Sequence, residues 1–157
     1  MNRGILFVGV VAVAVLVLSA SAGTAASGPG AMTAQAAPVV VMPSAIKWVP
    51  VEGMAPLQSV VLYGDPTKAG SLYALRYNVP DGFKFPVHWH PALEQVTVIS
   101  GSFMVGVGDK WDASKMTTLP AGTFVAIPPN VNHYGMAKGD TILEIHGIGP
   151  DTINMVK

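Results

Sequence analysis

Residues 82–101 read GFKFPVHWHPALEQVTVISG, and this stretch determines the fold expected of the chain. Between its two terminal glycines stand three residues able to bind a metal: His88, His90 and Glu94. A second stretch, residues 122–133, reads GTFVAIPPNVNH and ends in His133. The chain has four histidines, and three of them lie in these two stretches. Imidazole and carboxylate groups are the usual protein ligands of mid-row divalent metals, so the pattern predicts a metal site.

The sequence around these stretches is a series of short apolar runs separated by Gly, Pro, Asn and Asp. The runs are residues 60–63, 71–79, 87–90, 94–99, 102–107, 115–119, 123–127, 131–136 and 141–148. Short strands repeated every 8–12 residues or so, with turn residues between them, are typical of an all-β sandwich or barrel. Beyond the first twenty residues, the sequence has no long amphipathic helical period. The sequence therefore predicts an all-β domain.

Strand alternation shows how the four ligands could converge. Residues two apart on a strand face the same side, so His88 and His90 point together while Trp89 points away. A turn then ends this strand, and Glu94 is expected to enter the neighbouring strand facing the same interior. His133 comes from a much later strand and is expected to close the site from across the barrel. Three nitrogens and one oxygen leave open positions on an octahedral ion.

Four residues stand where the chain must turn tightly. Glycines bracket both stretches at Gly82, Gly101 and Gly122, and each is expected at a turn that favours a positive φ. Asn130 follows two prolines, and asparagine tolerates the left-handed conformation better than most side chains.

The two stretches resemble the two sequence motifs of the cupin superfamily. The first matches at every fixed position: Gly, five residues, His-x-His, three residues, Glu, six residues and Gly. The second has Gly122, Pro128 and His133 in register, but Asn130 replaces a glycine and Ala137 an asparagine. The resemblance implies a double-stranded β-helix of the jelly-roll type, and homodimers. It also implies a divalent ion (Fe, Mn, Zn or Ni) whose ligands are His88, His90, Glu94 and His133.

The N-terminus has the three-part pattern of a secretory signal peptide. A short segment containing Arg3 precedes an uncharged apolar run, and Ala20-Ser21-Ala22 then supplies a cleavage site. We expect a signal peptide over residues 1–22, a flexible Ala-, Gly- and Pro-rich leader over 23–43, and the cupin domain over 44–157. An uncleaved membrane anchor is the alternative, but Ser, Thr and Gly dilute the apolar run after Leu18.

Charge and composition give no sign of a partner that is a nucleic acid. The chain has nine basic and nine acidic residues, so loss of Arg3 with the signal leaves a formal charge of −1. No basic footprint for nucleic acid is evident. The chain has no cysteine, so neither disulfides nor a lipid-modified cysteine can occur. We expect a periplasmic or extracellular protein that is free of the membrane after signal cleavage.

Residues near the motifs have simpler interpretations. The fourth histidine, His146, is expected to be a surface or hydrogen-bonded residue, with orientation of a metal ligand as the alternative. Arg76 is expected to be a surface strand residue, with pairing to an anionic substrate as the alternative. Trp89 and Tyr134 are expected to face away from the metal, in the core or at an interface.

Three functions are compatible with this pattern. One is a metal-dependent enzyme of the cupin dioxygenase type acting on a small organic molecule, for which no separate catalytic base is evident. Another is an exported metal- or ligand-binding protein without turnover, and the third is a structural cupin with an empty site. The sequence favours an exported metal-binding protein. Because fold alone does not fix function, the sequence determines neither the substrate nor whether the protein is an enzyme.

Overall fold

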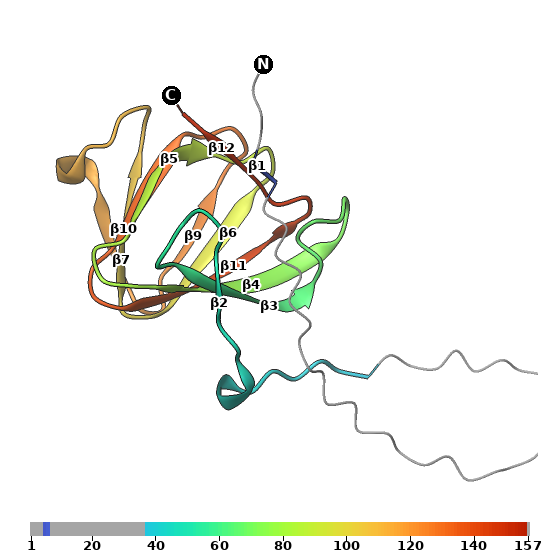
Figure 1. The fold of residues 1–157 in the computed structure, drawn as a ribbon. Helices are drawn as coiled ribbons and strands as arrows, with labels where there is room; N and C mark the ends of the chain where they lie inside the picture. Colours follow the sequence, from blue (N-terminus) through green and yellow to red (C-terminus); the bar gives the residue numbers. More distant parts are fainter. Residues whose placement is uncertain (1–4, 7–36, 157) are drawn as a thin grey trace, which may run out of the picture.

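Two six-stranded antiparallel sheets face each other and enclose the core of the domain (Figure 1). The computed structural model describes residues 5–6 and 37–156. The first sheet has the order β1-β12-β5-β10-β7-β8, with bounds Ile5–Leu6, Thr152–Met155, Lys84–Trp89, His133–Ala137, Ser102–Val107 and Thr117–Pro120. The second has the order β2-β3-β4-β11-β6-β9, with bounds Val49–Pro50, Gln58–Gly64, Leu72–Val79, Thr141–Ile148, Glu94–Ser100 and Phe124–Ile127.

The chain crosses repeatedly from one sheet to the other, as in a jelly roll. β5 lies in the first sheet, β6 in the second, β7 and β8 in the first, β9 in the second, β10 in the first and β11 in the second. Each inward face alternates with a more polar outward face, so that Val96 and Val98 of β6 are buried. Their aliphatic side chains pack with Leu143 and Ile145 of β11 in the core. The all-β prediction is confirmed.

The predicted strands agree with the structure except at particular ends. Residues 113–115 form a short 3-10 helix, η2 (Ala113–Lys115), where the sequence predicted the start of a strand. Asp112 explains this difference, because its side chain accepts a hydrogen bond from the Ser114 amide and caps the turn. Three strands were not predicted, namely β1, β2 and β12. They are two to four residues long, too short to show a period.

The predicted turn conformations are present. Gly82, Gly101 and Gly122 all have positive φ, and Asn130 is the one described non-glycine residue in that region, with a φ of 62°. At Gly101 a side chain would also collide with the backbone of Thr141, which lies 2.9 Å from the position of a Cβ atom. The tight turn between β6 and β7 therefore needs glycine for two reasons.

Most of the predicted signal peptide (1–22) and leader (23–43) lies outside the described residues. Of the signal, only Ile5–Leu6 is described, and it pairs with β12. The short 3-10 helix η1 (Pro43–Ala45) spans the predicted domain boundary at residue 44. Within the described part of the chain, none of the helices has the length and apolar character needed to cross a bilayer.

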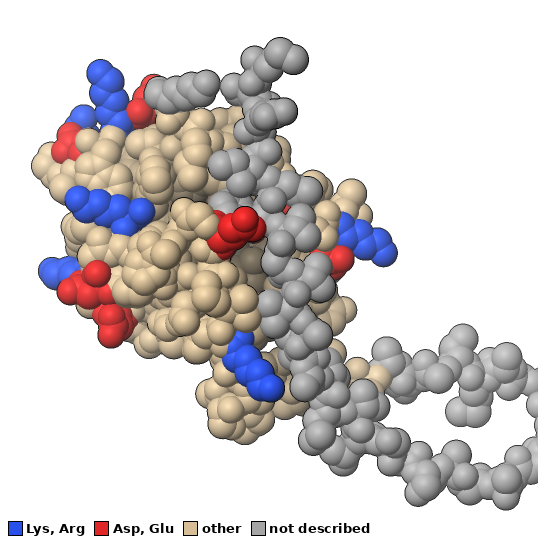
Figure 2. All heavy atoms as spheres, in the orientation of Figure 1, with Lys and Arg blue, Asp and Glu red and all other residues tan. Residues whose placement is uncertain are grey.

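Charged side chains are few on the face drawn in Figure 2. Basic and acidic groups of the described residues alternate there with broad uncharged surface, and blue and red side chains often lie next to one another. Charges of both signs therefore occur on this face.

Candidate metal centre

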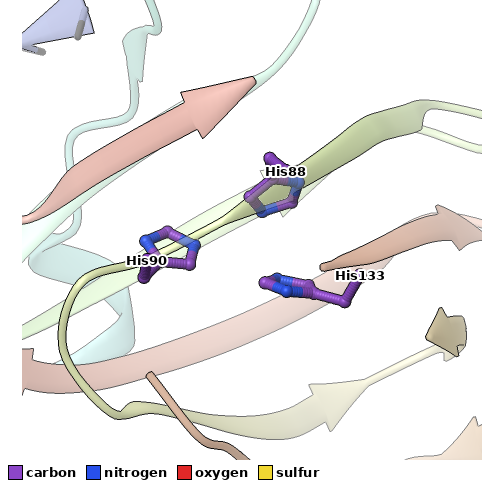
Figure 3. Close-up of side chains that lie close together, drawn as sticks. All are labelled: His88, His90 and His133. Carbon is purple, nitrogen blue, oxygen red and sulfur yellow. The ribbon is translucent and has the colours of Figure 1, made fainter. Parts of the chain in front are cut away.

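Three histidine rings converge between the two sheets (Figure 3). One ring nitrogen each from His88, His90 and His133 lies within 4.8 Å of the others, and all three side chains are buried. The ring centroids of His88 and His133 are 4.2 Å apart, and that of His90 lies 5.1 Å and 5.5 Å from them. The carboxylate of Glu94 joins the group, because its Oε2 is 3.2 Å from His133 Nε2 and 3.6 Å from His90 Nε2. The four residues that the sequence singled out thus lie together.

The structure reverses the predicted positions of two of these residues. His133 does not face the other ligands from across the barrel, because β10 is the hydrogen-bonded neighbour of β5 and His133 pairs directly with His88. Glu94 is the residue from the opposite sheet, since β6 pairs with β11 and β9. The prediction was wrong because sequence spacing does not show which distant strands pair, and the turn after His90 leads across the barrel.

Two of the three rings are held by backbone carbonyls. His88 Nδ1 lies 2.7 Å from the Pro86 carbonyl oxygen, and His133 Nδ1 lies 2.9 Å from that of Val131. A carbonyl can only accept, so each Nδ1 must donate its proton. On His88 this leaves the Nε2 lone pair free, and such a tautomer is the one that presents Nε2 to a metal.

The third ring is held differently. His90 Nε2 is the one side-chain polar atom, among those of the described residues, that is buried without a hydrogen-bond partner. A buried polar atom without a partner costs about 1–3 kcal/mol, so such atoms are rare and need an explanation. A metal ion is the simplest one, because it would accept this lone pair.

Electrostatics distinguish His88 from His133. Burial, followed by the nearby charge of His133, lowers the pKa of His88 to about 4, so His88 is neutral at physiological pH. Burial also tends to lower the pKa of His133, but the hydrogen bond and negative charge of Glu94 outweigh it and raise that pKa. Burial tends to raise the pKa of Glu94, and the His133 hydrogen bond and the histidine charges outweigh it and lower that pKa. Without a metal, Glu94 and His133 thus stabilise each other's charged forms, whereas binding a metal through Nε2 requires a neutral His133.

A family model described as the cupin domain matches residues 75–149, which include both motifs and all four candidate ligands. The chain belongs to the cupin superfamily. No curated protein matches it.

Several solved structures share the fold of this cupin at low sequence identity. The polyketide cyclase RemF from Streptomyces resistomycificus has a TM-score of 0.61 at 17% identity, covering 75% of this chain and 84% of that one. An RmlC-like cupin from Shewanella frigidimarina has a TM-score of 0.55 at 20% identity, covering 72% and 93%. A cupin 2 conserved barrel domain protein from Rhodopseudomonas palustris has a TM-score of 0.53 at 20% identity, covering 69% and 74%. At these identities the likeness concerns the fold alone.

The side chains of this cupin fit a divalent ion. Three imidazole nitrogens and one carboxylate oxygen form a donor set that suits Fe, Mn, Zn or Ni, and two of its contacts, 3.2 and 3.6 Å, are in the range of atoms sharing one ion. The partnerless His90 Nε2 supports the same conclusion from a separate observation.

A narrow apolar cavity of about 40 Å³ opens beside the ligands of this cupin. Its walls are mostly apolar and include Phe85, Val96, Phe103, Val105, Val125, Ile127, Leu143 and Ile145. His88, Glu94 and His133 line one part of it, and Tyr77 is a further lining residue with a polar group. None of the described residues that line it is Lys, Arg or Asp. A water molecule needs ~10–15 Å³ on this measure, so the space suits roughly three waters or one small molecule.

Two residues with open interpretations lie outside the cavity. His146 is exposed and lies 2.9 Å from Glu144 Oε1, which confirms a hydrogen-bonded surface histidine and not a residue orienting a metal ligand. Arg76 is paired with the same Glu144, 2.7 Å away, and alternates away from Tyr77, whose side chain lines the cavity. Arg76 is therefore engaged on the outer face of the second sheet.

Tyr134, which was predicted to face away from the metal, is fully buried and is among the residues that line the cavity. Its ring packs 5.0 Å from that of Trp111, and its hydroxyl donates to the Asp112 carbonyl. The segment between β7 and β8 therefore covers it. Trp89 is half-buried and pairs with Asn154 of β12.

Sequence reasoning missed one residue at the site. Asp151 Oδ1 lies 3.6 Å from His90 Nδ1, on the side of the ring opposite to Glu94. The residue falls outside both motifs, just after Gly149-Pro150, and only the return of the chain through β12 brings it close. A lone aspartate after a turn gave no signal in the sequence.

Proposed function

We propose that this cupin is an exported metal-binding protein whose divalent ion is held by His88, His90, Glu94 and His133. The observation that carries the proposal is the hydrogen bonding of the three histidine rings. Two donate Nδ1–H to carbonyl oxygens, and the third has a buried Nε2 with no partner. Side chains that serve only as core would not leave a buried lone pair unused.

Zinc, iron, manganese and nickel all suit this donor set, and the choice between binding and catalysis depends on which is present. A zinc ion would fit a binding or sensing role. Iron, manganese or nickel would fit an enzyme. The protein's own contribution in either case is to hold neutral imidazoles, exclude bulk water and supply one carboxylate that neutralises part of the ion's charge.

The direct experiment is titration of the metal-free protein with Zn²⁺ and with Mn²⁺. We expect one ion per chain with wild type and a large loss of affinity with Glu94→Gln, which removes the charge but keeps the shape. Glu144→Gln is the matched control, because Glu144 also contacts a histidine but lies on the outer face. Equal binding by wild type and Glu94→Gln would contradict the assignment.

A second candidate, a metal-dependent oxidoreductase of the dioxygenase type, is favoured by the cavity beside the ligands. A redox-active ion held there would supply open positions for a small organic ligand and O₂. The apolar walls of this cavity suit a small, uncharged ligand, because none of the described residues that line it is Lys or Arg. Fe²⁺- or Mn²⁺-loaded protein that turns over neither phenolic nor diketone compounds would argue against this candidate.

Export and assembly belong to the same proposal. The signal pattern of residues 1–22 supports a periplasmic or extracellular location, and the family resemblance supports a homodimer. Light scattering on the purified protein, with twice the chain mass expected, tests the dimer.

A further inference from the structure

His90 differs from the other two histidines in how its ring is held. The Nδ1 atoms of His88 and His133 each lie within 3 Å of a carbonyl two residues earlier in the chain. His90 lies one residue beyond the end of β5. Among the described residues, no backbone carbonyl forms a hydrogen bond with its Nδ1 as Pro86 does with that of His88. Its nearest charged neighbours are two carboxylates, Glu94 at Nε2 and Asp151 at Nδ1, each 3.6 Å away.

Backbone hydrogen bonds between two distant segments of the chain place Asp151 beside this ring. The Asp151 amide donates to the Pro66 carbonyl at 2.6 Å, and the Gly149 amide donates to Ser71 at 2.8 Å. The Gly70 amide in turn donates a hydrogen bond of 3.0 Å to the Gly149 carbonyl. The approach is so close that a Cβ at position 149 would lie 3.1 Å from the Asp65 carbonyl oxygen and nearer still to that of Lys68. The backbone around Asp151 is therefore held firmly.

The carboxylate itself is largely enclosed. Its side chain is 18% exposed, and the buried Tyr73 of β4 lines the same small pocket as Asp151 and His90. A buried carboxylate is costly unless it is paired, so Asp151 needs a hydrogen-bond donor among the groups beside it. The Nδ1–H of His90 is the group facing it that can serve.

We propose that Asp151 is a positioning residue that holds the His90 ring with Nε2 turned toward the metal, an inference that rests on the proposed metal site. A carboxylate behind a metal-bound imidazole fixes its tautomer and makes the nitrogen a stronger donor. Charge-assisted N–H···O bonds measure about 2.7–2.9 Å. His90 Nδ1 and Asp151 Oδ1 must therefore approach each other by about 0.8 Å to form this bond. Two of the ligands are thus held by local backbone, and the third by the C-terminal segment that follows β11.

The test compares Zn²⁺ affinity and histidine NMR signals in the full chain. Outer-sphere partners of metal-bound histidines are worth about 10–100-fold in metal affinity, so we expect Asp151→Ala to weaken Zn²⁺ binding by that factor. Asp151→Asn should weaken it less, because an amide oxygen still accepts from Nδ1–H. Glu144→Gln is the control, since its carboxylate contacts His146 on the outer face and should leave the affinity unchanged.

Long-range ¹H–¹⁵N spectra of the Zn²⁺-loaded protein separate positioning from a general loosening. We expect the His90 Nδ1–H signal to shift upfield in Asp151→Ala and Asp151→Asn, while those of His88 and His133 stay in place. Equal shifts of all three rings would overturn the positioning role. If Asp151→Ala does not fold, Asp151→Asn carries the same comparison, because it keeps the side-chain shape.

Two further outcomes are informative. Unchanged Zn²⁺ affinity with an unmoved His90 signal in both Asp151 variants overturns this inference and leaves the proposed metal site standing. A wild type that binds no Zn²⁺, Mn²⁺ or Fe²⁺ overturns the metal site, and this inference with it.

Discussion

Replacing His88 with glutamine should change how the stability of the metal-free protein depends on pH. His88 is buried, and its pKa of about 4 in the folded protein lies below the ~6.5 of an unfolded chain. A histidine whose pKa is depressed by folding binds a proton more readily in the unfolded state. The free energy of unfolding therefore falls as the pH drops from 6.5 toward 4, and the loss ends below 4.

The size of this effect follows from the difference between the two pKa values. About 2.5 units at 1.36 kcal/mol each correspond to roughly 3 kcal/mol, of which about 2.5 kcal/mol is expressed at pH 4.5. The raised pKa of His133 acts in the opposite direction, adding stability below its unfolded value, and Glu94 loses its contribution as the pH falls toward acid. Both groups remain in His88→Gln, so the difference in slope between the two proteins reports mainly on His88.

The assay is urea unfolding of chelator-treated protein at pH 7.5, 6.5, 5.5 and 4.5. Glutamine cannot donate in the same way to the Pro86 carbonyl, so the variant is expected to be less stable at pH 7.5, and only the slopes are compared. Wild type should lose about 2.5 kcal/mol more than His88→Gln by pH 4.5. His146→Gln, an exposed histidine, is the control and should follow wild type. Parallel curves for wild type and His88→Gln would refute the reasoning.

Three other predictions test the fold, the outer face and the N-terminus. Gly106→Ala should cost about 1–3 kcal/mol in urea unfolding, because its Cβ would collide with the buried Tyr134 ring, and a cost near zero would contradict this packing. Arg76→Ala should leave metal binding intact and lower stability by at most about 1 kcal/mol, since its partner Glu144 is partly solvated; lost metal binding would place Arg76 at the site. Mass spectrometry of the exported protein should give a chain starting at Gly23, and an intact Met1 would indicate a retained anchor.

The local features of the site could be predicted from sequence because they depend on short-range rules. His88 and His90 share a face by strand alternation, and Asn130 can adopt its positive φ because asparagine tolerates the left-handed conformation. These rules involve residues a few positions apart. They therefore also gave most of the strand boundaries, with errors of one to three residues at the ends.

What could not be predicted depends on pairing between distant segments. The sequence placed His133 across the barrel, yet β10 pairs with β5, and no periodicity within either strand indicates that choice. Asp151 approaches His90 only because Gly149 packs against the turn between β3 and β4. Both errors concern contacts between residues more than forty positions apart, which local patterns do not encode.

The metal content of protein purified from its own compartment tests the central claim most directly. After dialysis, elemental analysis of wild type should give about one divalent ion per chain, and His133→Ala, which removes one of three buried imidazoles, should give almost none. His146→Ala, outside the site, should retain the wild-type content. Wild-type protein that carries no metal, or His133→Ala that keeps the full amount, would contradict the account.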